Sequence, residues 1–142
     1  MTNTFKTPSS IPVIGRLLMS AIFVLSGMGK LAAPAMTIGY IAAMGLPFAT
    51  LGFILAVVTE LGGGVLLALG YKTRLTALVL AIFSVVTGVI FHHALGDQNQ
   101  MIHFLKNLAM AGGLLQVVAF GAGAFSLDTR SPKPGTTRSV IL

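Results

Sequence analysis

The chain has no cysteine, and charged residues make up only 8% of its 142 residues. The lack of cysteine excludes disulfides, zinc–thiolate sites and cysteine-ligated iron–sulfur clusters within this chain. Soluble domains usually carry about a quarter charged residues. The low charge and a mean hydropathy of +0.93 therefore exclude an ordinary soluble domain. Carboxylates are especially scarce, since Asp and Glu together number 3. This is the composition of a polytopic membrane protein.

Positive charge is what the chain has in excess, with a net charge of +6 and a pI near 10.4. Nucleic-acid binding is not expected, because no basic helix is interleaved with aromatic residues. The Lys and Arg residues instead occupy tails and short loops, where they act as topology signals. The expected partner is the lipid bilayer.

Four apolar segments are each about long enough to cross a bilayer as a helix. They cover residues 11–31, 49–69, 75–95 and 101–121. The segment between the first two is apolar but broken by Pro34 and Pro47, which favours a short interfacial helix at about 37–44 over a fifth span. The sequence therefore predicts an all-α fold, a four-transmembrane-helix bundle formed by residues 1–128.

Most of the Lys and Arg residues fall on one side of these four spans, which predicts that both termini are cytoplasmic. The expected location is a bacterial inner membrane, crossed several times. The polar, proline-containing segment from Ser126 is expected to be disordered, and residues 129–142 are assigned as a cytoplasmic tail.

Glu60 lies near the middle of the second span, where an ionisable group is costly and usually functional. Gly52, Ala56, Gly64 and Ala68 share its helix face at four-residue steps. Small residues in this pattern allow another helix to approach closely. Glu60 is therefore expected to face protein.

Several polar side chains of the other spans are expected to gather above Glu60, toward the outer side. They are Lys30, His92 or His93, His103, Lys106 and Asn107. An isolated carboxylate in an apolar interior would take up a proton, which favours pairing. Lys106 is the first candidate for the partner and Lys30 the second, the two sharing the carboxylate as a further option. Whether Lys30 points inward is left open, whereas Arg16 is expected to anchor the cytoplasmic end of the first span.

Metal and haem sites are not expected. The three histidines lack an acidic-His spacing, and haem with two axial histidines needs facing ligands at matched depth. The glycine-rich patches at 27–29, 62–64 and 112–113 lack the strand–turn–helix context of a nucleotide loop, so they predict close helix packing.

The same residues resemble those of the DoxX family of bacterial inner-membrane proteins. The similar segments, in order, are Ser26-Gly27-Met28-Gly29-Lys30, Glu60-Leu61-Gly62-Gly63, Gly70-Tyr71-Lys72-Thr73-Arg74, Phe104-Leu105-Lys106-Asn107 and Gly121 to Asp128. The family is named from proteins similar to the small membrane subunit of an archaeal thiosulfate:quinone oxidoreductase. The resemblance thus implies a quinone-linked redox role in the membrane.

The leading hypothesis is an outer-facing polar pocket that binds a quinone or small anionic substrate within an oxidoreductase system. Glu60 would handle the proton, Lys30 and Lys106 would attract negative charge, and Asn107, His103 and His92 would bind the head group. The alternative is a scaffold or accessory subunit in which a buried ion pair fixes helix assembly. A small transporter is a third class, disfavoured by the lack of an inverted repeat. Enzymatic activity, a redox partner subunit and a homo-oligomer are left open.

Overall fold

The computed structural model describes residues 10–130, which contain helices and no strands. Four helical segments are long and apolar enough to cross a membrane. They are α1 (Ser10–Ala32), the composite segment Ala49–Leu69, α5 (Thr73–Phe91) and α6 (Gln98–Phe120). The predicted all-α architecture with four spanning helices is confirmed.

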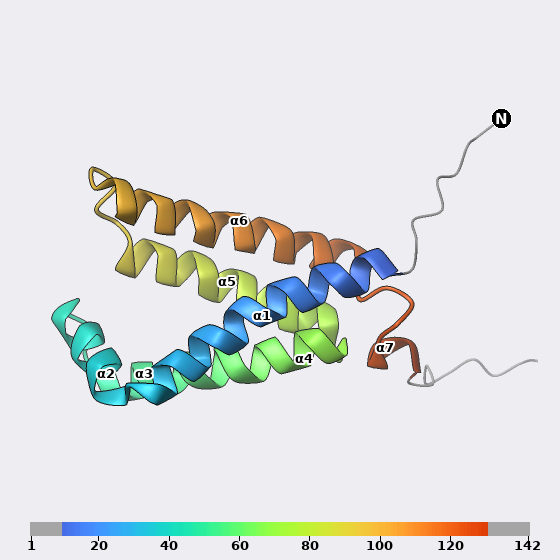
Figure 1. Ribbon diagram of the computed structural model, residues 1–142, viewed down its shortest axis with the longest axis horizontal. Coiled ribbons are helices and arrows are strands. Elements are labelled where there is room, and N and C mark those ends of the chain that lie inside the picture. Colours follow the sequence, from blue (N-terminus) through green and yellow to red (C-terminus); the bar gives the residue numbers. More distant parts are fainter. Residues whose placement is uncertain (1–9, 131–142) are drawn as a thin grey trace, which may run out of the picture.

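The four segments form two helical hairpins (Figure 1). One pairs α1 with the composite segment, and the other pairs α5 with α6. The hairpins meet at the end where α1 begins, the closed end of the bundle, and diverge toward the opposite, open end (Figure 1). The core lies where they meet and includes Phe23, Leu67, Leu80 and Leu114.

The composite second segment changes its helix type around Glu60. It consists of α3 (Ala49–Val57), the π-helical turn η1 (Val58–Gly62) and α4 (Gly63–Leu69). A π turn inside an α-helix is rare and often marks a functional site. Gly70 ends α4 in the left-handed conformation, with φ 69°, which glycine adopts without steric cost.

A short helix, α2 (Pro34–Ala43), lies at the open end between the first two spans (Figure 1). Its presence confirms the predicted short helix at this point of the chain, and it begins at a proline, which suits the first turn. The third span ends at Phe91, four residues before the predicted boundary. His92 caps α5 outside the helix, and Asp97 starts α6 by accepting a 2.9 Å hydrogen bond from the Gln100 amide.

The closed end is held by Arg16, which is only 2% exposed. Its Nη1 donates to the carbonyls of Leu67 and Ala68 at 2.9 and 3.0 Å, and its Nη2 donates to the Phe125 carbonyl at 2.6 Å. The prediction that Arg16 only anchors the end of the span is therefore wrong. Carbonyls at the end of a helix lack partners within it, and a guanidinium supplies several donors at once.

The C-terminal segment also packs onto this end. Ser126 is buried, and residues Leu127–Arg130 form the short helix α7. Asp128 of this helix accepts hydrogen bonds from the amides of Lys72 and Thr73, at 2.7 and 2.9 Å, at the start of α5. The disorder predicted from Ser126 onward is thus wrong for residues 126–130, because their polar groups find partners. The rest of the predicted tail, 131–142, lies outside the described residues.

Candidate functional site

Glu60 is joined to α1 by a compact polar cluster formed with Ser26 and Lys30. The Lys30 Nζ lies 2.8 Å from Oε2 and 2.9 Å from Oε1 of the carboxylate. The Ser26 hydroxyl donates to Oε1 at 3.1 Å and accepts a 2.8 Å hydrogen bond from Lys30. Glu60 is 5% exposed, so the pair compensates a charge that burial would otherwise make costly.

Lys106 was the first candidate for the partner of Glu60, and the structure gives that position to Lys30. Lys106 is exposed on α6, the helix on the far side of α5 from the carboxylate. Lys30 and Ser26 are one helical turn apart on the face of α1 that packs against η1, so both reach the same carboxylate. Lys30 therefore points inward.

A glycine allows this close approach of α1 to η1. A Cβ added at Gly27 would lie 2.7 Å from Cγ of Leu61 and 3.3 Å from Cβ of Glu60. Gly27 is buried in this contact, whereas Gly29, two residues on, has no atom within 4 Å of an added Cβ. The predicted role of the first glycine patch in helix packing thus holds at Gly27 and not at Gly29.

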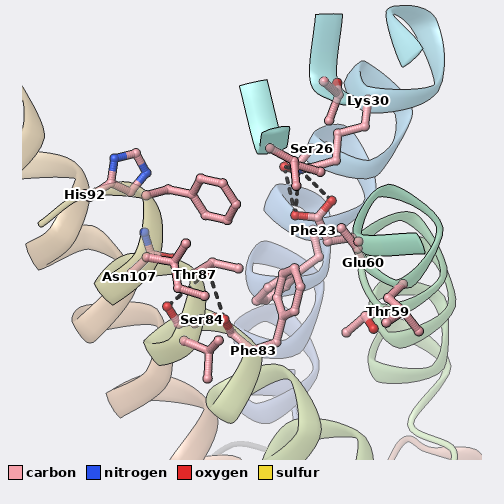
Figure 2. Close-up of a pocket in the computed structure, with 18 of the residues that line it drawn as sticks. Phe23, Ser26, Lys30, Thr59, Glu60, Phe83, Ser84, Thr87, His92 and Asn107 are labelled. Carbon is pink, nitrogen blue, oxygen red and sulfur yellow. Dashed lines mark hydrogen bonds and ion pairs between the residues drawn. The ribbon is translucent and has the colours of Figure 1, made fainter. Parts of the chain in front are cut away.

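The cluster lines a cavity of about 550 Å³ that lies between the two hairpins. Figure 2 shows Ser26, Lys30 and Glu60 on one side of the cavity, and His92 and Asn107 on the other. Most of the remaining lining is apolar or aromatic, and it is contributed by α1, α2, α3, α5, α6 and the loop between α2 and α3. These side chains include Ile22, Phe23, Ile41, Leu46, Leu55, Phe83, Val86, Ile90, Phe91 and Met110. A volume of this size falls within the range of small-molecule sites.

The α5–α6 side of the cavity is organised by stacked histidines. The rings of His92 and His103 have centroids 4.9 Å apart and planes 19° apart. His92 Nδ1 also lies 2.9 Å from the side-chain oxygen of Gln100. If Nδ1 carries the proton in this contact, Nε2 is an acceptor. His92 lines the cavity, and His103 supports its ring.

The structure thus brings together most of the side chains that the sequence predicted for the site. Glu60, Lys30, His92 and Asn107 line the cavity. His103 contacts the cavity only through His92, and Lys106 lies outside its lining. Asn107 uses one amide N–H on the His103 carbonyl, at 3.0 Å, which leaves its carbonyl oxygen as an acceptor.

Sequence reasoning missed Ser26 as a partner of Glu60, together with the contact between Tyr40 and Phe91. Ser26 lies four residues before Lys30, a spacing that places both on one helix face and could have indicated the contact. Tyr40 of α2 stacks on Phe91, with ring centroids 5.6 Å apart, and both line the cavity. No sequence pattern points to this pairing, since it depends on how the linker folds back over α5.

The hydroxyls of Ser84 and Thr87 also line the cavity, but they donate to backbone carbonyls of their own helix. They therefore add little donor capacity for a ligand. Chemically, the site offers an ammonium and a carboxylate that can exchange a proton, with a histidine and an amide on the facing side. No cluster of three or more metal-ligating side chains occurs in residues 10–130.

Comparison with known proteins places the chain in a family. The DoxX family model matches residues 11–93. The inner membrane protein YqjF of Escherichia coli K12 is 38% identical over 118 residues, which cover 82% of this chain and 88% of that protein. The inner membrane protein YphA of the same organism is 37% identical over 123 residues, covering 83% and 88%.

A more distant match is the Surfeit locus protein 4 homolog of Drosophila melanogaster. It is 35% identical over 77 residues, which cover 49% of this chain and 28% of that protein. No solved structure matches the chain. The family model, the two bacterial relatives and the four spanning helices agree: the chain belongs to the DoxX family and is a multi-pass inner-membrane protein.

Proposed function

We propose that the protein is the membrane component of a quinone-linked oxidoreductase system, and that the cavity between its hairpins binds the quinone head group. The observation that carries the proposal is the cavity itself. It has the Lys30–Glu60 ion pair on one side and His92 and Asn107 on the other, with an apolar space between them. Both termini are assigned to the cytoplasm, so that the cavity opens toward the outer face.

The lining suits a ring that carries a carbonyl on each of two opposite sides. Lys30, a quarter of whose side chain is exposed, would donate one ammonium N–H to one carbonyl by exchanging a contact with the carboxylate, whereas the single O–H of Ser26 is already donated to Glu60. On the facing side, the second N–H of the Asn107 amide can donate to the other carbonyl, whereas His92 Nε2, an acceptor while Nδ1 holds the proton, suits a quinol hydroxyl. Apolar and aromatic side chains between these groups would contact the ring faces.

Reduction of a quinone to the quinol takes up two electrons and two protons. The electrons would come from a reduced partner subunit. Protons would pass through Glu60, whose carboxylate is held by Lys30 and Ser26 beside the cavity.

Binding of a short-chain quinone to the purified, folded protein tests the proposal. Glu60→Gln preserves the shape of the side chain but removes its charge, and Lys30→Met removes a charged donor. Hydrogen bonds to charged groups contribute about 1.5–3 kcal/mol, so each variant should weaken binding at least about tenfold. Asp97→Asn is the matched control, because Asp97 caps α6 outside the cavity lining and its loss should leave quinone affinity unchanged.

The second candidate function is a scaffold in which the ion pair fixes assembly. It is favoured by one observation, namely that the Lys30–Glu60–Ser26 cluster is itself a link between α1 and η1. In that case Glu60→Gln lowers the amount of folded protein, and the folded fraction shows no quinone affinity to lose. Full quinone affinity in a folded Glu60→Gln variant would contradict the leading proposal.

A further inference from the structure

The polarity of α6 is at odds with its position in the bundle. Of the four spanning helices it has the lowest mean hydropathy, 1.3 against 1.8 to 2.2 for the others. It is also the least buried: 11% of its 18-residue apolar stretch is buried within the bundle, against 22% to 33% for the other three helices. A helix that meets lipid should be the most apolar, and a polar one should be covered by protein. α6 lies at the edge of the bundle, beside α5 (Figure 1).

Lys106, a charged residue of α6, adds to this conflict between polarity and exposure. Lys106 is exposed and lies eight residues from the start of α6, about 12 Å along the axis. The whole helix of 23 residues is about 34 Å long, so Lys106 begins within about 5 Å of its midpoint. A lysine near the end of a span can reach the headgroups, but one near the centre needs a partner.

The chain itself has no carboxylate to offer. Its Asp and Glu residues number 3. Glu60 is paired with Lys30, Asp97 caps α6, and Asp128 caps the start of α5. A second copy of the chain would bring the same three engaged side chains, together with another Lys106. Homo-oligomer formation through this face would therefore place like charges together.

The same exposed side of α6 is suited to close contact with another helix. Ala109, Gly112 and Gln116 follow Lys106 at steps of three and four residues, and all are exposed. An added Cβ at Gly112 would meet no atom within 4 Å, so nothing in the described chain fills this side. Small side chains permit close helix approach, and a glutamine amide can hydrogen-bond across the contact.

We infer that this face of α6 docks a transmembrane helix of a different protein, one that carries an Asp or Glu within its span to pair with Lys106. The partner is defined by that chemistry: an apolar helix with a buried carboxylate. The inference is independent of which ligand occupies the cavity, since the face lies outside the cavity lining.

Photocrosslinking in native membranes tests it. A photoreactive residue at position 109 should give a discrete adduct with a second protein. The same residue at position 82, which is exposed on α5, should label lipid alone. Mass spectrometry should place the crosslink in an apolar segment of about 20 residues that contains Asp or Glu. In the protein with the photoreactive residue at position 109, Lys106→Met should reduce the amount of adduct about tenfold, whereas Lys106→Arg should retain it.

Four results would overturn the inference. An adduct made of two copies of this chain would identify the face as a homo-oligomer contact. Labelling of lipid alone at position 109 would mean that Lys106 reaches the headgroups. A partner segment without a carboxylate, or an adduct insensitive to Lys106→Met, would remove the charge argument. Crosslinking does not depend on quinone binding, so these failures are separable from failure of the proposed function.

Discussion

Arg16 and Lys30, the two basic side chains on the inward face of α1, make their contacts at opposite ends of this helix. Arg16 at the closed end is almost fully buried, and its guanidinium donates to backbone carbonyls of three residues. Lys30 at the open end pairs with a carboxylate and keeps a quarter of its side chain exposed beside a cavity. A cation bonded to backbone carbonyls holds helices together. A cation that lies beside a cavity and pairs with a titratable group can also bind a ligand.

The fork of Arg and the point charge of Lys suit these two tasks. A guanidinium carries five N–H donors in a fixed plane and stays protonated, so it can satisfy carbonyls from two chain segments together. An ammonium is compact and can give up a proton more readily. The contrast between them predicts that the closed end sets stability and the open end sets ligand binding.

The largest effect is expected from Arg16→Met. It removes the side-chain donor of three carbonyls, those of Leu67, Ala68 and Phe125. A buried group that loses its donor costs about 1–3 kcal/mol, and the Ala68 and Phe125 bonds are only partly buried, so stability should fall by roughly 3–5 kcal/mol. Thermal unfolding in detergent, monitored by size-exclusion chromatography, measures this loss of stability. Arg74→Gln is the control, since Arg74 is exposed and should tolerate the change. If Arg16→Met unfolds at the same temperature as the unsubstituted protein, the closed end does not set stability.

An intermediate effect is expected from Gly27→Ala, which tests how closely α1 must approach η1. The new Cβ would lie 2.7 Å from Leu61 and 3.3 Å from Glu60, so overpacking should cost about 1–3 kcal/mol and displace the carboxylate. Both the unfolding temperature and quinone affinity should fall.

Two glycines provide matched controls for Gly27→Ala. Gly29→Ala meets no atom within 4 Å and should change neither property. Gly70→Ala would place a Cβ 2.5 Å from Arg16 Nη1 at the closed end, in a residue with positive φ, and should lower stability alone. If Gly27→Ala behaves like Gly70→Ala, the cavity does not depend on this contact.

The smallest effect is expected at Asp128, outside the spans. Burial alone would raise the pKa of its carboxyl, but hydrogen bonds from Thr73 and Lys72 and the charge of Arg16 together lower the pKa below its usual 3.8. A lowered pKa means that the stabilisation is complete above 3.8 and is lost as the pH falls below that value. Asp128→Asn should therefore cost about 1 kcal/mol, a typical capping effect, at neutral pH.

Unfolding temperatures measured across pH test this sign. The difference between the unsubstituted protein and Asp128→Asn should be constant from about pH 5 upward and should close under strongly acidic conditions. A difference that widened on acidification would show that the carboxylate is not held by these donors. Glu60→Gln should leave the acid dependence caused by Asp128 intact, since Glu60 lies near the middle of its span and pairs with Lys30, away from the groups that act on Asp128.

Composition and hydrophobic run length were sufficient to predict the all-α class and the four spans. A membrane removes alternatives, because backbone polar groups in hydrocarbon must be satisfied within helices. The same constraint made Glu60 conspicuous, since an ionisable residue in the middle of an apolar run needs a partner. The sequence could not identify that partner, because either Lys30 or Lys106 could pair with Glu60.

The way the helices face one another emerged only from their packing. Gly27 brings α1 against η1, so Lys30 reaches Glu60, while α6 turns Lys106 away from the cavity. The donors of Arg16 found carbonyls in segments 51 to 109 residues away in the sequence. The sequence alone shows which segments enter the membrane, because the free energy of transfer from water to lipid is a sum over the residues of each segment. Pairing and burial depend on rotation and contact between helices, which no single segment specifies.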